Sequence, residues 1–171
     1  PFRLRGIRQR LAVGPRRLGD LGERHVRREI EERGHRVVPV SAFGAERLAS
    51  LDALVLLQPY EQNDALYTPA DMAAIEGFVR DGGGLVALSE AGSGSAEAID
   101  NWNRLVEPFG VAFAVAAAEP SGRTLTAFAA HPVTDGVTSL GVDWCRPLAA
   151  IRPPALDLTI GGSRDDAIAV F

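Results

Sequence analysis

The sequence predicts a single soluble α/β domain, residues 1–171, built on a mainly parallel, doubly wound sheet with a strand-rich C-terminal extension. Apolar strands alternate with amphipathic helices as far as Gly110. Two short runs, Ala53–Leu57 and Leu85–Leu88, are apolar throughout, which is typical of strands covered on both faces. The length of 171 residues, with 46% hydrophobic and 23% charged residues, suits one domain that can bury a core.

The first part of the chain supplies the outer strands and the first helix. Arg10–Val13 has the composition of a first strand. Asp20 begins a helix with capping-box spacing, and Gly34 ends it. Arg36–Val40 follows as a second strand, in which Pro39 lacks an N–H group and therefore belongs at an edge or a strand end.

The next two helices each follow one of the apolar runs. Thr68 is expected to cap the first of them, with Pro69 in its first turn, Asp71 at N3 and Gly82 at its end. Its buried stripe comprises Met72, Ile75, Phe78 and Val79. The second helix has the apolar positions Ile99, Trp102, Leu105 and Val106. Two successive strand–helix–strand units imply right-handed crossovers and a doubly wound sheet.

Beyond Gly110 the pattern becomes one of short strands joined by segments rich in proline and glycine. The expected strands are Val111–Val115, Thr124–Phe128, Leu156–Ile160 and Ala167–Phe171. We expect residues 111–171 to extend the same sheet. The last strand looks incomplete, so we expect the chain to be a fragment of a longer protein with additional domains.

Composition and charge exclude several classes of protein. All 18 basic residues are arginine, and most of them lie in residues 1–36. Many of these arginines pair with glutamates at i,i+4 spacing, as on a solvated helix face. No nucleic-acid partner is therefore expected. No apolar run approaches the roughly 20 residues of a membrane span. The single cysteine, Cys145, excludes an internal disulfide and a multi-cysteine zinc site, and it leaves a cytoplasmic or a secreted location open.

Four segments in order carry a resemblance to a known superfamily. Their sequences are LDALVLLQP (51–59), TPADMAAIEGFVRDGGGLVAL (68–88), NRLVEPFG (103–110) and HPVTDGV (131–137). Over residues 20–140 the chain resembles class I glutamine-amidotransferase-like (GATase1-like) proteins. It is most similar to their divergent branch in intraflagellar-transport proteins (GIFT-type domains) and in uncharacterised bacterial multidomain proteins.

This resemblance implies a flavodoxin-like sheet and a scaffold without amidotransferase activity. Active members carry a cysteine just after the strand that corresponds to Leu85–Leu88, where this chain has Ser89. The catalytic His-x-Glu pair is not present, because His131 is followed by Pro132 and Val133. The resemblance therefore implies a pseudoenzyme.

A ligand cleft is expected at the carboxyl ends of the two apolar strands, where open α/β sheets bind their ligands. The expected ligand-binding residues are Gln58, Tyr60, Glu61, Ser89, Glu90 and Ser93. No metal is expected, because Glu61, Asp64 and Glu90 do not have the spacing of a metal site. No cofactor is expected either, because the chain has no lysine for a Walker motif and no G-x-G-x-x-G sequence.

The preferred hypothesis is a non-catalytic domain that binds a small molecule or a protein partner. One alternative is a hydrolase using Ser89 or Glu90, for which His131 or His25 would have to supply the base. The sequence LSEAG does not fit the nucleophile elbow, and His131 is expected mainly to shape a turn. A structural or oligomerisation module is the third hypothesis. The aromatic side chains of Tyr60, Tyr67 and Trp144 are weaker candidates for a binding surface.

Overall fold

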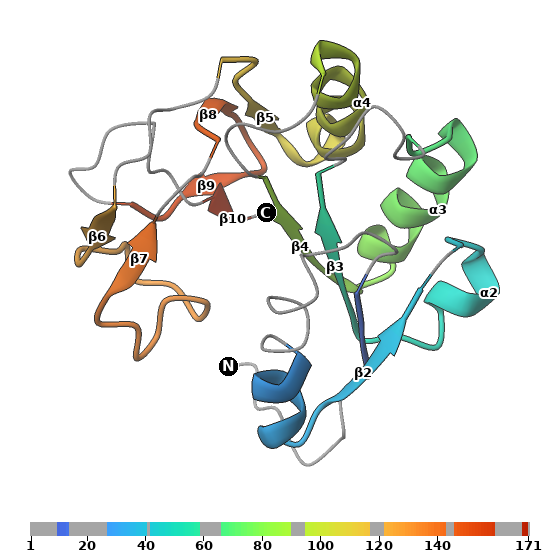
Figure 1. Ribbon diagram of the computed structural model, residues 1–171, viewed down its shortest axis with the longest axis horizontal. Helices are drawn as coiled ribbons and strands as arrows, with labels where there is room; N and C mark the ends of the chain where they lie inside the picture. Colours follow the sequence, from blue (N-terminus) through green and yellow to red (C-terminus); the bar gives the residue numbers. More distant parts are fainter. Residues whose placement is uncertain are drawn as a thin grey trace. The chain divides into compact units, whose positions relative to one another are not determined.

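The computed structural model describes residues 10–13, 27–40, 42–58, 66–89, 95–116, 122–142, 146–159 and 169–170. They form mixed helix and strand structure with small sheets (Figure 1). The chain divides into two compact units: residues 1–57 with 64–88, and residues 58–63 with 89–171. None of the described helices is both long and apolar enough to cross a membrane.

The first unit contains a four-stranded sheet in the order β2-β1-β3-β4. Its strands are β1 (Arg10–Val13), β2 (Arg36–Pro39), β3 (Ala53–Leu57) and β4 (Gly84–Leu88). Every neighbouring pair is parallel, and β3 pairs with β4 without a shift from Ala53↔Gly84 to Leu57↔Leu88. The prediction that the two apolar runs lie side by side and point the same way is confirmed.

The two apolar strands differ in how well they are covered. In β3, Leu54, Val55 and Leu56 are buried, as predicted. In β4, Val86 and Leu88 are each 45% exposed, so the expectation that both faces of this strand are covered is wrong. The exposed positions alternate along β4, so one face of the strand is less covered than the other, and apolar composition does not reveal which neighbours cover a strand. At one edge of the sheet Pro39 ends β2, as expected.

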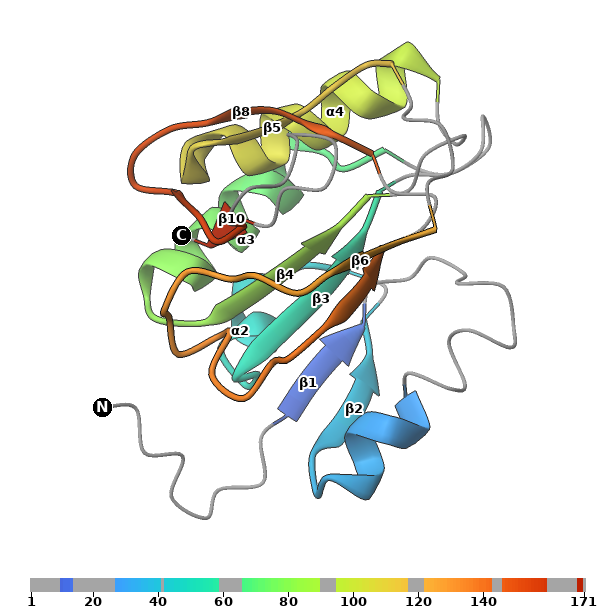
Figure 2. The ribbon, with the colours of Figure 1, turned by 90° about the vertical axis from the view of Figure 1, so that its left-hand side faces the viewer.

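Helices connect the parallel strands of the first unit. Residues 27–32 are helical, and Gly34 follows with a φ of 87°, while the predicted start at Asp20 lies outside the described residues. The short helix α2 (Ala45–Leu48) was not predicted, since one turn leaves no periodic pattern. Helix α3 spans Pro69–Arg80. Figures 1 and 2 show α2 and α3 on one face of the sheet and the helix at 27–32 on the other.

The start of α3 is fixed by the predicted capping box. The Thr68 side chain accepts a hydrogen bond from the Asp71 backbone N–H at 3.2 Å, and the Asp71 carboxylate accepts one from the Thr68 N–H at 3.0 Å. Pro69 occupies the first turn, where its missing N–H has no cost. The preceding Tyr67 is only 4% exposed, and its ring lies 5.6 Å from that of Phe43. Tyr67 is therefore a core residue, and its candidacy for a binding surface is wrong.

The second unit pairs its strands in another way. It contains α4 (Ala96–Val106), the 3-10 helix η1 (Glu107–Phe109), β5 (Val111–Phe113), β6 (Arg123–Leu125), β7 (Leu140–Val142), β8 (Leu148–Ile151), β9 (Leu156–Asp157) and β10 (Ala169–Val170). Strand pairs β5–β8, β6–β7 and β9–β10 are antiparallel two-stranded sheets. Among the described residues these strands do not extend the four-stranded sheet, contrary to expectation. Antiparallel pairs need no helical crossover between their strands, and the sequence of residues 111–171 shows no helical periodicity that would provide one.

Helix α4 and strand β5 form the core of the second unit. The predicted apolar positions of α4 are all buried, and the ring of Trp102 lies 6.3 Å from that of Phe113. The Asn103 side chain donates to the Phe113 carbonyl at 2.9 Å and accepts from the Phe113 N–H at 2.7 Å. Those two bonds satisfy both backbone groups of Phe113, which anchors β5 to the helix.

Gly110, between η1 and β5, provides a sharp stability test. Its φ is 83°, and an added Cβ would lie 2.1 Å from the Arg152 carbonyl oxygen. We predict that Gly110→Ala lowers the free energy of unfolding by about 3–5 kcal/mol, because backbone strain and overpacking add. Urea denaturation followed by tryptophan fluorescence measures the loss.

Gly136 offers a matched control, because its φ is 77° and no atom lies within 4 Å of an added Cβ. Gly136→Ala should cost only the left-handed backbone strain, about 1–2 kcal/mol. Equal losses in the two variants would contradict the steric argument.

Candidate functional site

The two residues that directly follow β3 and β4 meet through their side chains. The last residues of these strands, Leu57 and Leu88, are register partners, so the chain places Gln58 and Ser89 at equivalent positions. The Ser89 hydroxyl donates a hydrogen bond to Gln58 Oε1. The structure therefore brings together two of the residues that the sequence predicted for the ligand cleft.

Arg146 completes this contact, and sequence reasoning missed it. The residue precedes β8 and is only 5% exposed. Its Nε donates to Gln58 Oε1 at 3.3 Å, and its Nη1 donates to the carbonyl oxygens of Ala114 at 3.0 Å and Val115 at 2.6 Å. We call Gln58, Ser89 and Arg146, with these two carbonyl groups, the polar cluster. An arginine between Cys145 and Pro147 lies in no periodic pattern, so nothing in the sequence marked it as buried.

Burial sets the electrostatic character of the cluster. Desolvation of the guanidinium lowers the pKa of Arg146 below its ordinary value. An arginine nevertheless stays protonated in proteins, so the cluster holds a permanent positive charge. Gln58 is also buried, at 6% exposed, whereas Ser89 is half-buried and so reaches solvent.

The hydrogen bonds of the cluster determine how the Gln58 amide is oriented. Arg146 Nε can only donate, so the atom that faces it must be the amide oxygen and not the amide nitrogen. The same oxygen receives the Ser89 hydroxyl, which therefore also donates. Two donors that converge on one buried oxygen hold the side chain of Gln58 in a single orientation.

The hydrogen bond to Gln58 does not by itself activate Ser89 as a nucleophile. A serine nucleophile needs a base to accept its proton, and an amide oxygen is not basic enough for that role. Among the described residues, no histidine or carboxylate hydrogen-bonds to the Ser89 hydroxyl. The cluster can instead hold a ligand group by hydrogen bonding.

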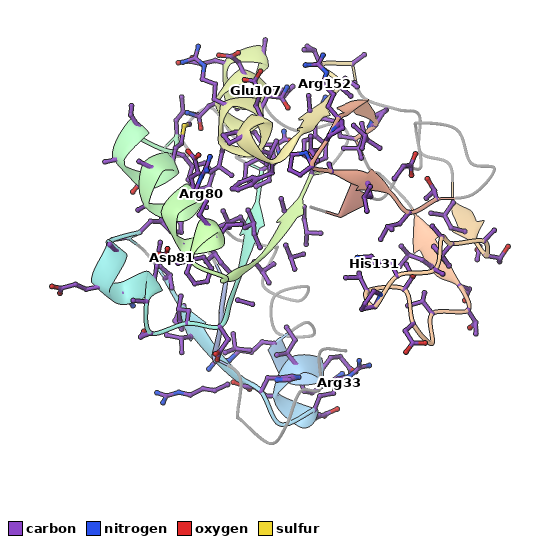
Figure 3. All side chains as sticks on the ribbon, turned by 180° about the vertical axis from the view of Figure 1, so that it is seen from behind. Arg33, Arg80, Asp81, Glu107, His131 and Arg152 are labelled. Atoms are coloured by element: carbon purple, nitrogen blue, oxygen red, sulfur yellow. The ribbon has the colours of Figure 1, made fainter. Side chains whose placement is uncertain are left out.

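His131, the proposed base of the hydrolase alternative, is engaged in its own turn (Figure 3). Its Nδ1 accepts a hydrogen bond from the Val133 N–H at 3.2 Å, and its carbonyl accepts from the Thr134 N–H at 2.9 Å. The Thr134 hydroxyl donates to the Ala129 carbonyl at 2.7 Å. The predicted turn is confirmed, and these contacts give His131 a structural role within it.

The remaining candidates cannot be placed in the cluster. Tyr60, Glu61, Glu90 and Ser93 lie outside the described residues, as do Asp64, His25, Trp144 and Cys145. In the part of the chain that the structure describes, no three histidine, cysteine, aspartate or glutamate side chains gather as metal ligands.

Comparison with known proteins does not assign the chain to a family. No protein-family model matches it, and no curated protein or solved structure matches it either. The candidate site is therefore defined by its geometry.

The polar cluster predicts a large stability effect at Arg146. In Arg146→Met the carbonyl groups of Ala114 and Val115 and the amide oxygen of Gln58 all lose a donor. We expect the free energy of unfolding to fall by about 1–3 kcal/mol, because the buried amide oxygen of Gln58 loses a donor and such a loss is costly. Urea denaturation provides the measurement.

The matched control is Arg152→Met, which alters an exposed arginine that follows β8 (Figure 3). It should change the stability by no more than about 0.5 kcal/mol. The structural importance of the cluster would be refuted by an equally small loss in Arg146→Met.

Proposed function

We propose that this chain is a non-catalytic ligand-binding domain on a glutamine-amidotransferase-like scaffold with a flavodoxin-like, doubly wound sheet. The strand order β2-β1-β3-β4 supports the scaffold, since flavodoxin-like sheets have the order 2-1-3-4-5. The helices on both faces of the sheet add further support (Figure 2). Such sheets bind ligands outside the carboxyl ends of their strands, which is where Gln58 and Ser89 follow β3 and β4.

The observation that carries the proposal is the hydrogen bond from Ser89 to Gln58. The resemblance to amidotransferase-like proteins would place a nucleophile at residue 89, yet here the hydroxyl proton is held by a neutral amide oxygen. The buried guanidinium of Arg146 holds that oxygen in place. A polar group that is already oriented, and that has no base bonded to its hydroxyl among the described residues, is suited to binding and not to acyl transfer, because binding sites gain affinity from oriented groups.

A thermal-shift screen against a library of small metabolites tests this function. A ligand at 100 times its Kd should stabilise the native chain by about 2.7 kcal/mol. We expect stabilising compounds whose effect is lost in Gln58→Leu and kept in Ser50→Ala, which removes a serine hydroxyl bonded to the carbonyl of Arg47. Stabilisation that Gln58→Leu leaves intact would place the ligand elsewhere.

The same protein preparation separates binding from hydrolysis. A fluorophosphonate probe should label the wild-type chain no more than it labels Ser89→Ala. Labelling that depends on Ser89 would establish the hydrolase alternative and remove the non-catalytic assignment.

A second candidate function is self-association, favoured by the surface of β4. Val86 and Leu88 are each 45% exposed on an outer strand of the described sheet. Exposed apolar side chains on a sheet edge are a common basis for pairing with another chain. This candidate corresponds to the structural or oligomerisation module considered from the sequence.

Self-association predicts a concentration-dependent mass that Val86→Arg abolishes. A buried charge at the strand pairing surface would be costly, so the variant should be monomeric in size-exclusion chromatography with light scattering. Val133→Arg is the matched control, because Val133 is 61% exposed in the turn before β7. A wild-type chain that is monomeric at all concentrations would rule this function out.

A further inference from the structure

The hydrogen-bonding state of Ser89 restricts what can bind there. A serine hydroxyl has one proton to donate and two lone pairs that accept. That proton is committed to Gln58 Oε1, which Arg146 Nε identifies as an oxygen that carries no hydrogen. The half-buried Ser89 Oγ therefore meets a ligand with its lone pairs and acts as an acceptor.

We propose that Ser89 selects a neutral ligand group that donates a hydrogen bond, a hydroxyl or an amide N–H, over a carboxylate or phosphate oxygen. The inference rests on the proposed function, because it takes the polar cluster to be a ligand site. It adds the chemical class of the ligand, which the sequence did not indicate.

An anionic oxygen is disfavoured because it has only lone pairs to offer, and these would face the lone pairs of Ser89 Oγ. To bind it, Ser89 would have to turn its proton away from Gln58 Oε1, and a buried acceptor would lose a donor. The charge of Arg146 acts in the opposite direction, since it attracts anions. Its Nε and Nη1 groups, however, already donate to the oxygens of Gln58, Ala114 and Val115, so these donors are not available to a ligand anion.

A cationic donor is disfavoured for a different reason. An ammonium group at Ser89 would lie close to the guanidinium, whose Nε is 3.3 Å from the amide oxygen that Ser89 contacts. Two like charges repel strongly where burial lowers the dielectric constant. A neutral donor avoids both penalties.

An NMR titration of the ¹⁵N-labelled chain with four small probes tests the selectivity. Acetamide supplies an amide N–H donor and glycerol supplies hydroxyl donors, and the two distinguish the possible sources. Sodium acetate and inorganic phosphate supply anionic oxygens at matched ionic strength. We expect at least one neutral probe to shift the backbone amide signals of Gln58 and Ser89 with a Kd at least about 5-fold lower than either anion.

Variants connect the selectivity to the Ser89 hydroxyl. Ser89→Ala should weaken the neutral probe by about 2- to 10-fold, as expected for one neutral hydrogen bond. Ser89→Thr keeps the hydroxyl and should keep the affinity within about 2-fold. Ser50→Ala should leave the affinity unchanged.

The possible failures are distinguishable. If acetate or phosphate binds more tightly than both neutral probes, and Ser89→Ala weakens it, the selectivity is overturned while the ligand-binding function stands. If the neutral probe binds equally well to Ser89→Ala, Ser89 is not the acceptor. If none of the four probes shifts either signal, the donor selectivity and the assignment of the polar cluster as the ligand site both fail.

Discussion

Parallel, in-register pairing of β3 with β4 is the constraint on which the candidate site depends. Because Leu57 and Leu88 are partners, the next residue of each strand emerges at the same level of the sheet. A slip of one residue would reverse the direction of every side chain on one strand, and Gln58 would no longer face Ser89. The register of the two apolar strands therefore places Ser89 where its hydroxyl can hydrogen-bond to Gln58.

The polar cluster then combines residues that are far apart in the sequence. Gln58, Ser89 and Arg146 come from three separate segments, and the carbonyl groups of Ala114 and Val115 come from a fourth. Burying a guanidinium is costly unless it is hydrogen-bonded, and here three oxygens accept hydrogen bonds from Arg146. That requirement makes the cluster specific in geometry, because no shorter or neutral side chain would supply the same three hydrogen bonds.

The hydrogen bonds of the cluster also support the proposal that Ser89 takes part in binding. Ser89 donates its proton to an amide oxygen, which is not basic enough to raise its reactivity, and its lone pairs can still accept hydrogen bonds. His131 is held by its own turn through Val133 and Thr134. The turn and the cluster therefore have separate structural roles among the described residues.

Local chemistry decided how much of the fold the sequence could predict. The capping box of Thr68 and Asp71, the buried stripe of α4 and the parallel pairing of the apolar runs all follow from short-range patterns. The short helix α2 and the strands β7 and β8 were missed, because segments of three or four residues carry too little periodicity to be recognised.

By itself the sequence determined the alternation of strands and helices as far as Gly110, the capping box of α3, and the positions of Gln58 and Ser89 after two apolar strands. Only the tertiary structure decided that β4 is partly exposed, that the later strands pair antiparallel, and that Arg146 is buried against Gln58. The physical reason is that caps and periodicity act within a few residues. Burial and hydrogen-bond partners depend instead on segments that meet only when the chain folds, here residues 88 positions apart.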